Sequence, residues 1–336
     1  MSLRNSRVRR GGAILLTAAF AASLAACTPA PSDAPTGGGG DGEPRVSFVA
    51  ALMTATYFQV MKCGAEAAAA EYGVDLDWQG DANWDLQTQI PLINAAVQTD
   101  PAGMVVVPTD PIALIDTVET IASSGTPVIT VDGSLNEPVE LQNIRTDNIG
   151  AGGLAAEALG EAIGGEGTVL VIASEPGIAA NAERVDGFAE RMAELYPDVT
   201  VLPTEYSNSD QTTAAQIANA ALTNPDLKGI YTTLAPASAG ASSAIQASGR
   251  TGEVKLVAYD ADPAQIADLK AGIYDALVAQ DPYGLGYDSV ARVAQIIDGS
   301  LDPASLDYQE YVDGFIIDRE NVDTEEAQRY IYVPTC

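Results

Sequence analysis

The feature of this chain that most constrains its fold is a repeated alternation of short apolar runs with longer alanine-rich segments. The short runs, such as GMVVVP at 103–108 and GTVLVIA at 167–173, are rich in β-branched residues and lack a period of two. A continuous apolar run of this length is typical of a central strand in a parallel sheet. Strands that alternate with helices form parallel sheets covered by helices on both faces. The sequence therefore predicts an α/β fold.

The predicted strands and helices are too numerous for one sheet. A polar stretch, IRTDNIG at 144–150, carries an Asx residue that can cap a new helix, and the strand pattern starts afresh after it. We therefore expect two similar α/β lobes with a break near this stretch. The strands are expected at 45–52, 74–80, 103–109, 127–132, 141–146, 167–174, 199–206, 229–234, 254–260, 275–281 and 311–317. Helices are expected at 58–72, 86–99, 112–124, 149–163, 180–196, 211–223 and 285–297.

The composition excludes several classes of function. The 336 residues include no histidine, which rules out a Ser-His-Asp triad, a Cys-His pair and histidine-ligated zinc or haem. The formal net charge of −30 repels phosphate backbones, so no nucleic-acid partner is expected. No G-x-G-x-x-G follows the first strand and no G-x-S-x-G occurs, so neither a nicotinamide dehydrogenase nor a serine hydrolase is indicated. We expect no cofactor and no bound metal.

The first residues have the pattern of an export signal. Residues 1–26 hold Arg4, Arg7, Arg9 and Arg10 and no acid, followed by an apolar run that is too short for a confident membrane span. The run stops at LAAC, which resembles the lipobox of bacterial lipoproteins. That resemblance implies lipidation of Cys27 and cleavage just before it; an ordinary signal peptide with an incidental cysteine is the alternative. Residues 27–44, rich in Pro, Gly and Ser, are expected to be a flexible tether.

Two further cysteines remain, Cys63 and Cys336. Export would place them in a compartment that permits disulfides, and their number is even. A bridge would fasten the C-terminal tail to the first helix. Because spacing alone does not fix geometry, two reduced thiols stay the alternative.

Ligands in open α/β sheets collect outside the carboxyl ends of the strands. The polar and aromatic side chains expected there are Tyr57, Trp84, Thr109, Asp132, Ser174, Asn181, Arg184, Thr232, Asp260 and Gln280. Two strand ends are alike, VITVDG and LVAYDAD, and each offers a lone carboxylate, Asp132 in the first lobe and Asp260 in the second. This pair is the main candidate for chemistry.

The pair of carboxylates allows two functional interpretations. As an enzyme, the chain would use them as in glycoside hydrolysis, which needs a fixed separation that two movable lobes do not supply. As a binding protein, the chain would use them to accept hydrogen bonds from hydroxyl groups. Arg184 would add a planar donor, Gln280 an amide, and Tyr57, Phe58 and Trp84 flat apolar faces for a sugar ring. The second interpretation uses more of the candidate residues, and we favour it.

Over nearly the whole exported body, the chain resembles the periplasmic-type solute-binding proteins of ABC sugar importers, in the ribose/galactose-binding branch. The segments that carry the resemblance are TYFQVMKCGAEAAAAEYGVDL, VVVPTD, PVITVDG, IRTDNIGAGGLAAE, NAERVDGF, VAYDADP and ALVAQDPYGLG. The resemblance implies two Rossmann-like lobes with parallel sheets, joined by a multi-strand hinge that closes on one small solute. It also implies lobe boundaries of 45–146 plus about 281–310, and 147–280 plus about 311–336.

The resemblance implies roles for individual residues. Tyr57 and Phe58 match the stacking aromatics of the first loop, Asp132 and Asp260 the carboxylates that grip hydroxyls, and Gln280 the amide at the last crossing. Arg184 lies in the arginine-bearing helix start, but its offset from GF differs from the ribose-type ligand arginine, and Asn181 or Ala182 falls nearer that place.

Two departures from the ribose-type pattern concern the solute. Gly133 and Leu234 stand where ribose-type binders have an arginine and an asparagine, so a solute other than ribose is expected.

The sequence thus predicts an exported, non-enzymatic binding protein with no catalytic residues. We expect a small sugar or polyol as ligand, ABC permease subunits as partners, and a lipid anchor on the outer face of the cell membrane, or a periplasmic location. A sensory receptor of the same fold and a surface-anchored glycosidase are the alternatives.

Overall fold

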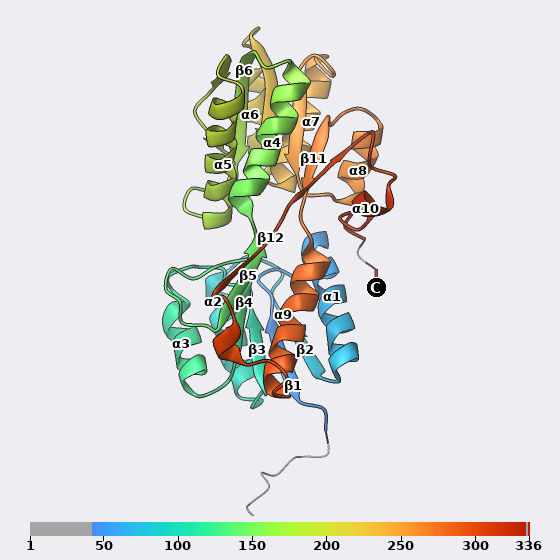
Figure 1. Cartoon of the computed structure of the whole chain (residues 1–336). Coiled ribbons are helices and arrows are strands. Elements are labelled where there is room, and N and C mark those ends of the chain that lie inside the picture. The colour runs from blue at the N-terminus through green and yellow to red at the C-terminus, as the bar shows by residue number, and fades with distance from the viewer. Residues whose placement is uncertain (1–41, 334) are drawn as a thin grey trace, which may run out of the picture. The chain divides into compact units, whose positions relative to one another are not determined.

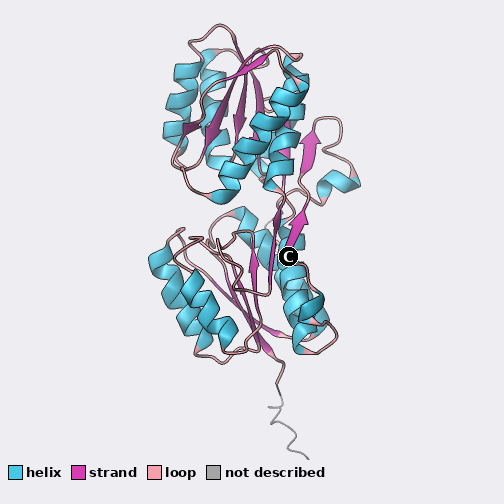
Figure 2. Cartoon of the chain, turned by 60° about the vertical axis from the view of Figure 1, so that its left-hand side comes forward, coloured by secondary structure: helices cyan, strands magenta, loops and turns pink. Residues whose placement is uncertain are grey.

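The computed structural model describes residues 42–333 and 335–336, so the predicted signal peptide, Cys27 and most of the predicted tether lie outside the described residues. The described chain contains two sheets, each with helices on both faces (Figures 1 and 2). This is the two-lobe α/β fold that the sequence predicts. None of the described helices combines the length and the apolar character that crossing a membrane requires.

The first sheet has the strand order β12-β5-β4-β3-β1-β2, and all its pairs are parallel. Its strands are β1 (Arg45–Val49), β2 (Asp75–Gln79), β3 (Gly103–Val106), β4 (Val128–Val131), β5 (Gln142–Thr146) and β12 (Gln309–Val312). Every residue of β3, β4 and β5 is buried. This explains the absence of a period of two, because both faces of a central parallel strand are covered by helices.

The second sheet has the order β13-β11-β10-β9-β6-β7, with β8 also paired to β6. Its strands are β6 (Gly167–Ala173), β7 (Val199–Val201), β8 (Glu205–Tyr206), β9 (Leu227–Thr232), β10 (Lys255–Tyr259), β11 (Ala276–Ala279) and β13 (Phe315–Asp318). Its pairs are parallel except β11 with β13, which is antiparallel. The predicted strand at 199–206 is divided in two, with Pro203 in the gap, because proline cannot donate to a ladder.

Four hydrophobic clusters make the core, one on each face of each sheet. The first sheet is covered by α1 (Thr56–Tyr72) and α9 (Pro282–Ile297) on one face and by α2 (Leu86–Val97) and α3 (Ile115–Ser123) on the other. The second is covered by α4 (Asn148–Ile163) and α5 (Ala179–Leu195) on one face. The other face carries α6 (Gln211–Ala221), α7 (Ala235–Ser248), α8 (Pro263–Lys270) and α10 (Glu325–Gln328). A short 3-10 helix, η1 (Pro303–Ser305), precedes β12.

Three segments cross from one sheet to the other (Figure 1). Two of them are built alike: β5 leads into α4 through Asp147, and β11 leads into α9 through Asp281. Each aspartate is the N-cap of its helix, and its carboxylate accepts from a glycine amide three residues on. The Thr146 hydroxyl donates to the Gln280 side-chain oxygen at 2.9 Å, which ties these two crossings together.

The third crossing corrects one predicted strand. The run at 311–317 is not continuous but divides into β12 and β13, which belong to different sheets. Asp313 and Gly314 lie between the two strands, and β12 stays paired with β5 to Val312. A Cβ at position 314 would lie 3.2 Å from the Ala151 Cβ, so the chain passes close to α4 where it changes sheets.

The C-terminal tail is joined to the first lobe by a disulfide. Cys63 of α1 is bonded to Cys336, with their Cα atoms 5.3 Å apart. The preceding part of the tail packs elsewhere: Ala327 and Tyr332 are buried in the core cluster of the second sheet. The tail therefore connects both lobes.

Candidate functional site

Asp132 and Asp260 occupy equivalent places, each directly after a central strand, β4 or β10. Both have positive φ angles, 64° and 76°, in the left-handed region that non-glycine residues seldom adopt. Such backbone strain persists only where the surroundings impose it, and it is commonest at functional sites. The two carboxylates are thus presented by the same backbone device in the two lobes.

Asp132 is held by an aromatic hydroxyl from the start of α1. Tyr57 donates its hydroxyl to Asp132 Oδ1 at 2.7 Å. Burial raises the pKa of Asp132 above its ordinary value, although the Tyr57 hydrogen bond and the charge of Arg184 oppose this shift. The negative charge of Asp260 raises the pKa of Asp132 further.

The predicted aromatic residues form a connected group beside Asp132. The Tyr57 and Phe58 rings meet edge to face with centroids 5.1 Å apart, and the Phe58 and Trp84 centroids are 6.3 Å apart. Phe58 is only 5 % exposed and belongs to the core, so it supports the group from behind. Trp84 is 42 % exposed, and its indole N–H donates to the Thr109 carbonyl at 3.1 Å, which fixes an apolar face at the surface.

In the second lobe, Arg184, Gln280 and Asp260 form a hydrogen-bonded chain. Arg184 Nη2 donates to Gln280 Oε1 at 3.3 Å, and Gln280 Nε2 donates to Asp260 Oδ1 at 3.1 Å. Asp260 Oδ2 accepts from the backbone amide of Ala235, at the start of α7. These bonds orient both carboxylate oxygens.

Arg184 is buried and almost fully engaged with protein groups. Its Nε donates to Asn148 Oδ1 at 2.8 Å, its Nη1 donates to the Thr233 carbonyl at 2.9 Å, and its guanidinium lies 3.7 Å from the Tyr259 ring centroid. Burial opposes its charge, but Tyr259 and the site carboxylates raise the pKa of Arg184 above its usual range. It therefore stays charged and fixes Gln280.

The predicted residue Asn181 lies next to this chain rather than in it. Its side-chain oxygen accepts from the Thr233 hydroxyl, and the Thr233 carbonyl accepts from Arg184. No described hydrogen bond links Asn181 to either carboxylate. The structure thus groups Tyr57, Phe58, Trp84 and Asp132 in one lobe and Arg184, Gln280 and Asp260 in the other. Asn181 is linked to the second group through Thr233.

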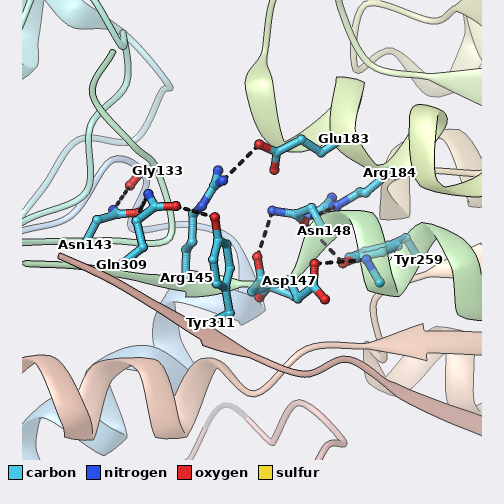
Figure 3. A network of polar contacts seen from close by, with 12 residues as sticks. Gly133, Asn143, Arg145, Asp147, Asn148, Glu183, Arg184, Tyr259, Gln309 and Tyr311 are labelled. Carbon is cyan, nitrogen blue, oxygen red and sulfur yellow. Dashed lines mark hydrogen bonds and ion pairs between the residues drawn. The ribbon is translucent and has the colours of Figure 1, made fainter. Parts of the chain in front are cut away.

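An ion pair near the crossings also joins the lobes (Figure 3). Arg145 of β5 donates to Glu183 of α5 at 2.9 Å, and its guanidinium lies 5.4 Å from the Tyr311 ring centroid. Arg145 is 8 % exposed, and its buried Nε has no hydrogen-bond partner among the described residues.

A cavity of about 290 Å³ lies beside Asp132 and Trp84, and Arg184, Gln280 and Asp260 are not among the residues that border it. Trp84, Asp132, Gly133 and Arg145 border it, and the loop at 176–180 borders it from the second lobe. Gly133 has a structural reason to lack a side chain, since a Cβ there would lie 2.5 Å from the Pro108 carbonyl oxygen. Its own carbonyl accepts from Asn143 Nδ2 at 2.8 Å, so the backbone is fixed as well (Figure 3).

Several residues of this region were not predicted from the sequence. Tyr259 directly precedes Asp260, and its place at the carboxyl end of a strand could have indicated it. Arg145 lies inside the polar stretch that marks the break between lobes, but nothing there shows that it reaches Glu183. Tyr332, whose hydroxyl contacts Asp260, lies on the tail, and only its closeness in sequence to Cys336 connects it to the first lobe.

The arrangement suits the binding of a polyhydroxylated solute. Two carboxylates accept hydrogen bonds from hydroxyl groups, a glutamine side chain supplies an amide, and an exposed indole face offers an apolar surface. Every one of these groups is held by neighbours before a ligand arrives, which reduces the entropy lost on binding.

Comparisons with known proteins agree with this fold. The family described as "Periplasmic binding protein domain" matches residues 46–301. The ribose import binding protein of Bacillus subtilis is 24 % identical over 278 residues, which are 82 % of this chain and 90 % of that protein. The xylitol-binding protein of Mycolicibacterium smegmatis is 25 % identical over 213 residues, which are 63 % of this chain and 60 % of that protein.

A solved structure extends the likeness to three dimensions. A solute-binding protein of an ABC transporter from Agrobacterium vitis, bound with α-D-tagatopyranose, superposes with a TM-score of 0.80. It is 30 % identical to this chain, and the match covers 87 % of this chain and all of the other.

Proposed function

The chain belongs to the periplasmic binding protein family, and from this premise we propose that it is the sugar- or polyol-binding subunit of an ABC transporter. The observation that carries the proposal is the pair of strand-end carboxylates, Asp132 and Asp260, one from each lobe. Each sits at a positive φ angle and is oriented by a neighbouring donor, Tyr57 or Gln280.

Recognition in this proposal rests on hydroxyl groups that lie between the lobes. Ring hydroxyls donate to Asp132 and Asp260, and Trp84 packs against the C–H face of the solute. Specificity follows because a solute without a matching hydroxyl leaves a buried carboxylate unpaired. The crossings between the lobes let the lobes close over the bound solute.

The solute is proposed to differ from ribose. Gly133 leaves no room for a side chain beside Asp132, and Leu234 offers no polar group where α7 begins. The ribose-binding pattern places polar side chains at both positions. The exposed face of Trp84 favours a solute that presents more apolar surface, such as a deoxy sugar.

The proposed delivery partner is the membrane permease of the transporter. Lipidation of Cys27 would hold the body at the outer face of the membrane, with residues 27–44 as the tether. Mass spectrometry of the mature protein tests this part, because a diacylated Cys27 at the N-terminus is expected and an unmodified N-terminus contradicts it. A sensory receptor of the same fold is the second candidate, separated from the first by whether the liganded protein stimulates permease-driven uptake.

A thermal-shift screen tests the binding function. Pentoses, hexoses, deoxy sugars and polyols, with D-ribose, D-tagatose and xylitol among them, are added to the mature protein. A true ligand at 100 times its Kd adds about 2.7 kcal/mol to the free energy of unfolding. Such a ligand raises the melting midpoint by several degrees.

Two variants make the screen specific to the site. Asp132→Asn keeps a residue that tolerates the left-handed backbone but removes the charge, and it should lose most of the ligand-induced rise. Glu119→Gln removes the same charge from an exposed face of α3 and should respond like the wild type. No response of the wild type to any of these solutes contradicts the proposal, and an unchanged response of Asp132→Asn contradicts the role of Asp132.

A further inference from the structure

The C-terminal tail reaches into the candidate site through one buried tyrosine. Tyr332 is 1 % exposed, and its hydroxyl donates to Asp260 Oδ1 at 3.2 Å. The same hydroxyl accepts from the Gln280 backbone amide at 3.3 Å. A phenolic hydroxyl has one donor and can also accept, so both of these bonds form together.

The two lobes thus use the same device to hold their carboxylates. Tyr57 donates to Asp132, and Tyr332 donates to Asp260. The two tyrosine rings also touch, edge to face, with centroids 5.8 Å apart. One tyrosine comes from the start of the first helix and the other from the end of the chain. Their contact therefore joins the two lobes next to the carboxylates.

Contacts on both sides hold the tail in this place. On the second lobe, the Tyr332 amide donates to the Ala261 carbonyl at 3.1 Å, and Tyr330 stacks on Phe315 with centroids 4.7 Å apart. On the first lobe, the disulfide binds Cys336 to Cys63. Only three residues separate Tyr332 from Cys336, so the tail spans at most about 14 Å between these two residues, and the Cα of Cys336 lies 5.3 Å from that of Cys63 in α1.

We propose that Tyr332 is a positioning residue of the solute site and that the Cys63–Cys336 disulfide keeps it there. This inference rests on the proposed binding function. With Tyr332 and Gln280 both donating to Asp260 Oδ1 and the Ala235 amide donating to Oδ2, about one acceptor position of the carboxylate is left for the solute. The bond to Tyr332 also prevents the carboxylate from rotating, which lowers the cost of ordering it when a solute binds.

Tyr332→Phe tests the positioning role, with Tyr330→Phe as the matched control. Both variants remove one hydroxyl from the tail, but only Tyr332 contacts a site carboxylate. With the sugar or polyol that gives the largest thermal shift, Tyr332→Phe should bind at least about tenfold more weakly, as expected for a lost bond to a charged group. Tyr330→Phe should bind as the wild type does.

Deoxy analogues of that solute separate positioning from general destabilisation. If Tyr332 orients Asp260 toward one hydroxyl of the solute, the monodeoxy analogue without that hydroxyl should bind Tyr332→Phe almost as tightly as it binds the wild type. The affinity lost by the substitution and the affinity lost by removing the hydroxyl should then not add. Equal weakening of the parent solute and all its monodeoxy analogues overturns the positioning role.

The disulfide is tested by reduction and by Cys336→Ser. Dithiothreitol gives two electrons and two protons to the bond, which becomes two thiols while the reagent closes to its own disulfide. The bond is open to the reagent, because Cys336 is exposed and both cysteines border a surface cavity of about 530 Å³. Reduction should weaken solute binding in the wild type and add little in Tyr332→Phe. Undiminished affinity after complete reduction, verified by thiol titration, overturns the role of the disulfide.

Hydrogen exchange provides a readout that needs no solute. The Gln280 amide donates to Tyr332, so its exchange should accelerate in Tyr332→Phe and in Cys336→Ser, but not in Tyr330→Phe. If the wild type binds no sugar or polyol, the proposed function fails, and this measurement still decides whether the disulfide keeps Tyr332 bonded to the Gln280 amide. Unchanged exchange of the Gln280 amide in both Tyr332→Phe and Cys336→Ser overturns the inference.

Discussion

At the scale of single residues, Asp132 serves the site at a cost to the fold. Its carboxylate is half-buried at a positive φ angle, and burial raises its pKa above the ordinary value of 3.8. The folded protein therefore holds this proton more tightly than the unfolded chain does. A solute hydroxyl, however, is best accepted by the ionised form. Stability and binding thus make opposite demands on the same group.

This conflict predicts opposite pH effects on stability and on affinity. The stability contributed by protonated Asp132 is fully present below pH 3.8 and is lost as the pH rises through its raised pKa. Urea denaturation of wild type and Asp132→Asn across that range should show the wild type losing stability relative to the variant as the pH rises. A constant or growing advantage of the wild type contradicts this sign. Solute affinity of the wild type should instead fall as the pH falls through the same pKa.

The sequence supports prediction of some site residues and not of others, for physical reasons. Asp132 and Asp260 are recognisable because each directly follows an apolar strand and the two strand ends, VITVDG and LVAYDAD, are alike. Arg145 and Tyr332 are not recognisable in this way, since their partners Glu183 and Asp260 are 38 and 72 residues away in the sequence and are brought near only by the tertiary fold. No periodicity in the sequence reports such contacts.

At the scale of elements, pairs of helices in both lobes pack through glycines. A Cβ at Gly152 of α4 would lie 2.2 Å from the Arg184 carbonyl oxygen, and one at Gly187 of α5 would lie 2.0 Å from the Ile149 carbonyl oxygen. Gly64 of α1 and Gly286 of α9 repeat this close approach in the first lobe. The α4–α5 contact matters for the site because it sets the position of Arg184.

A pair of neighbouring glycines tests this packing. Gly152→Ala should lower the free energy of unfolding by about 1–3 kcal/mol, because the contacting atom is backbone and α5 must move. Gly153 has only ordinary contact with the Arg191 side chain at 3.7 Å, so Gly153→Ala should raise stability by about 0.5–1 kcal/mol. Urea denaturation of both variants measures the difference. Equal stability of the two variants contradicts close packing of α4 on α5.

The elements themselves could be predicted better than their assignment to sheets. Apolar runs and helix caps lie in the local sequence, and the seven expected helices begin and end within a few residues of their expected positions, whereas α7, α8 and α10 were not among them. The run at 311–317 reads as one strand because both halves are apolar. Its division between two sheets follows from the passage of Gly314 across α4, which depends on tertiary structure.

At the scale of the whole molecule, the two sheets meet at three crossings, an ion pair and a disulfide-bound tail. Asp132 follows β4 in one sheet and Asp260 follows β10 in the other, and the charge of Asp260 contributes to the raised pKa of Asp132. The central claim is that a sugar or polyol binds between the lobes and contacts both carboxylates. Homology supports the fold and the class of solute, and the geometry of this chain supplies the residues.

The most direct test of this claim is a crystal structure of the protein with the solute that gives the largest thermal shift. We predict electron density for one solute molecule between the lobes, with separate hydroxyls within hydrogen-bond distance of Asp132 and Asp260. We also expect the Tyr332 hydroxyl to remain bonded to Asp260. A solute bound elsewhere, or bound between the lobes without contact to either carboxylate, would contradict this claim.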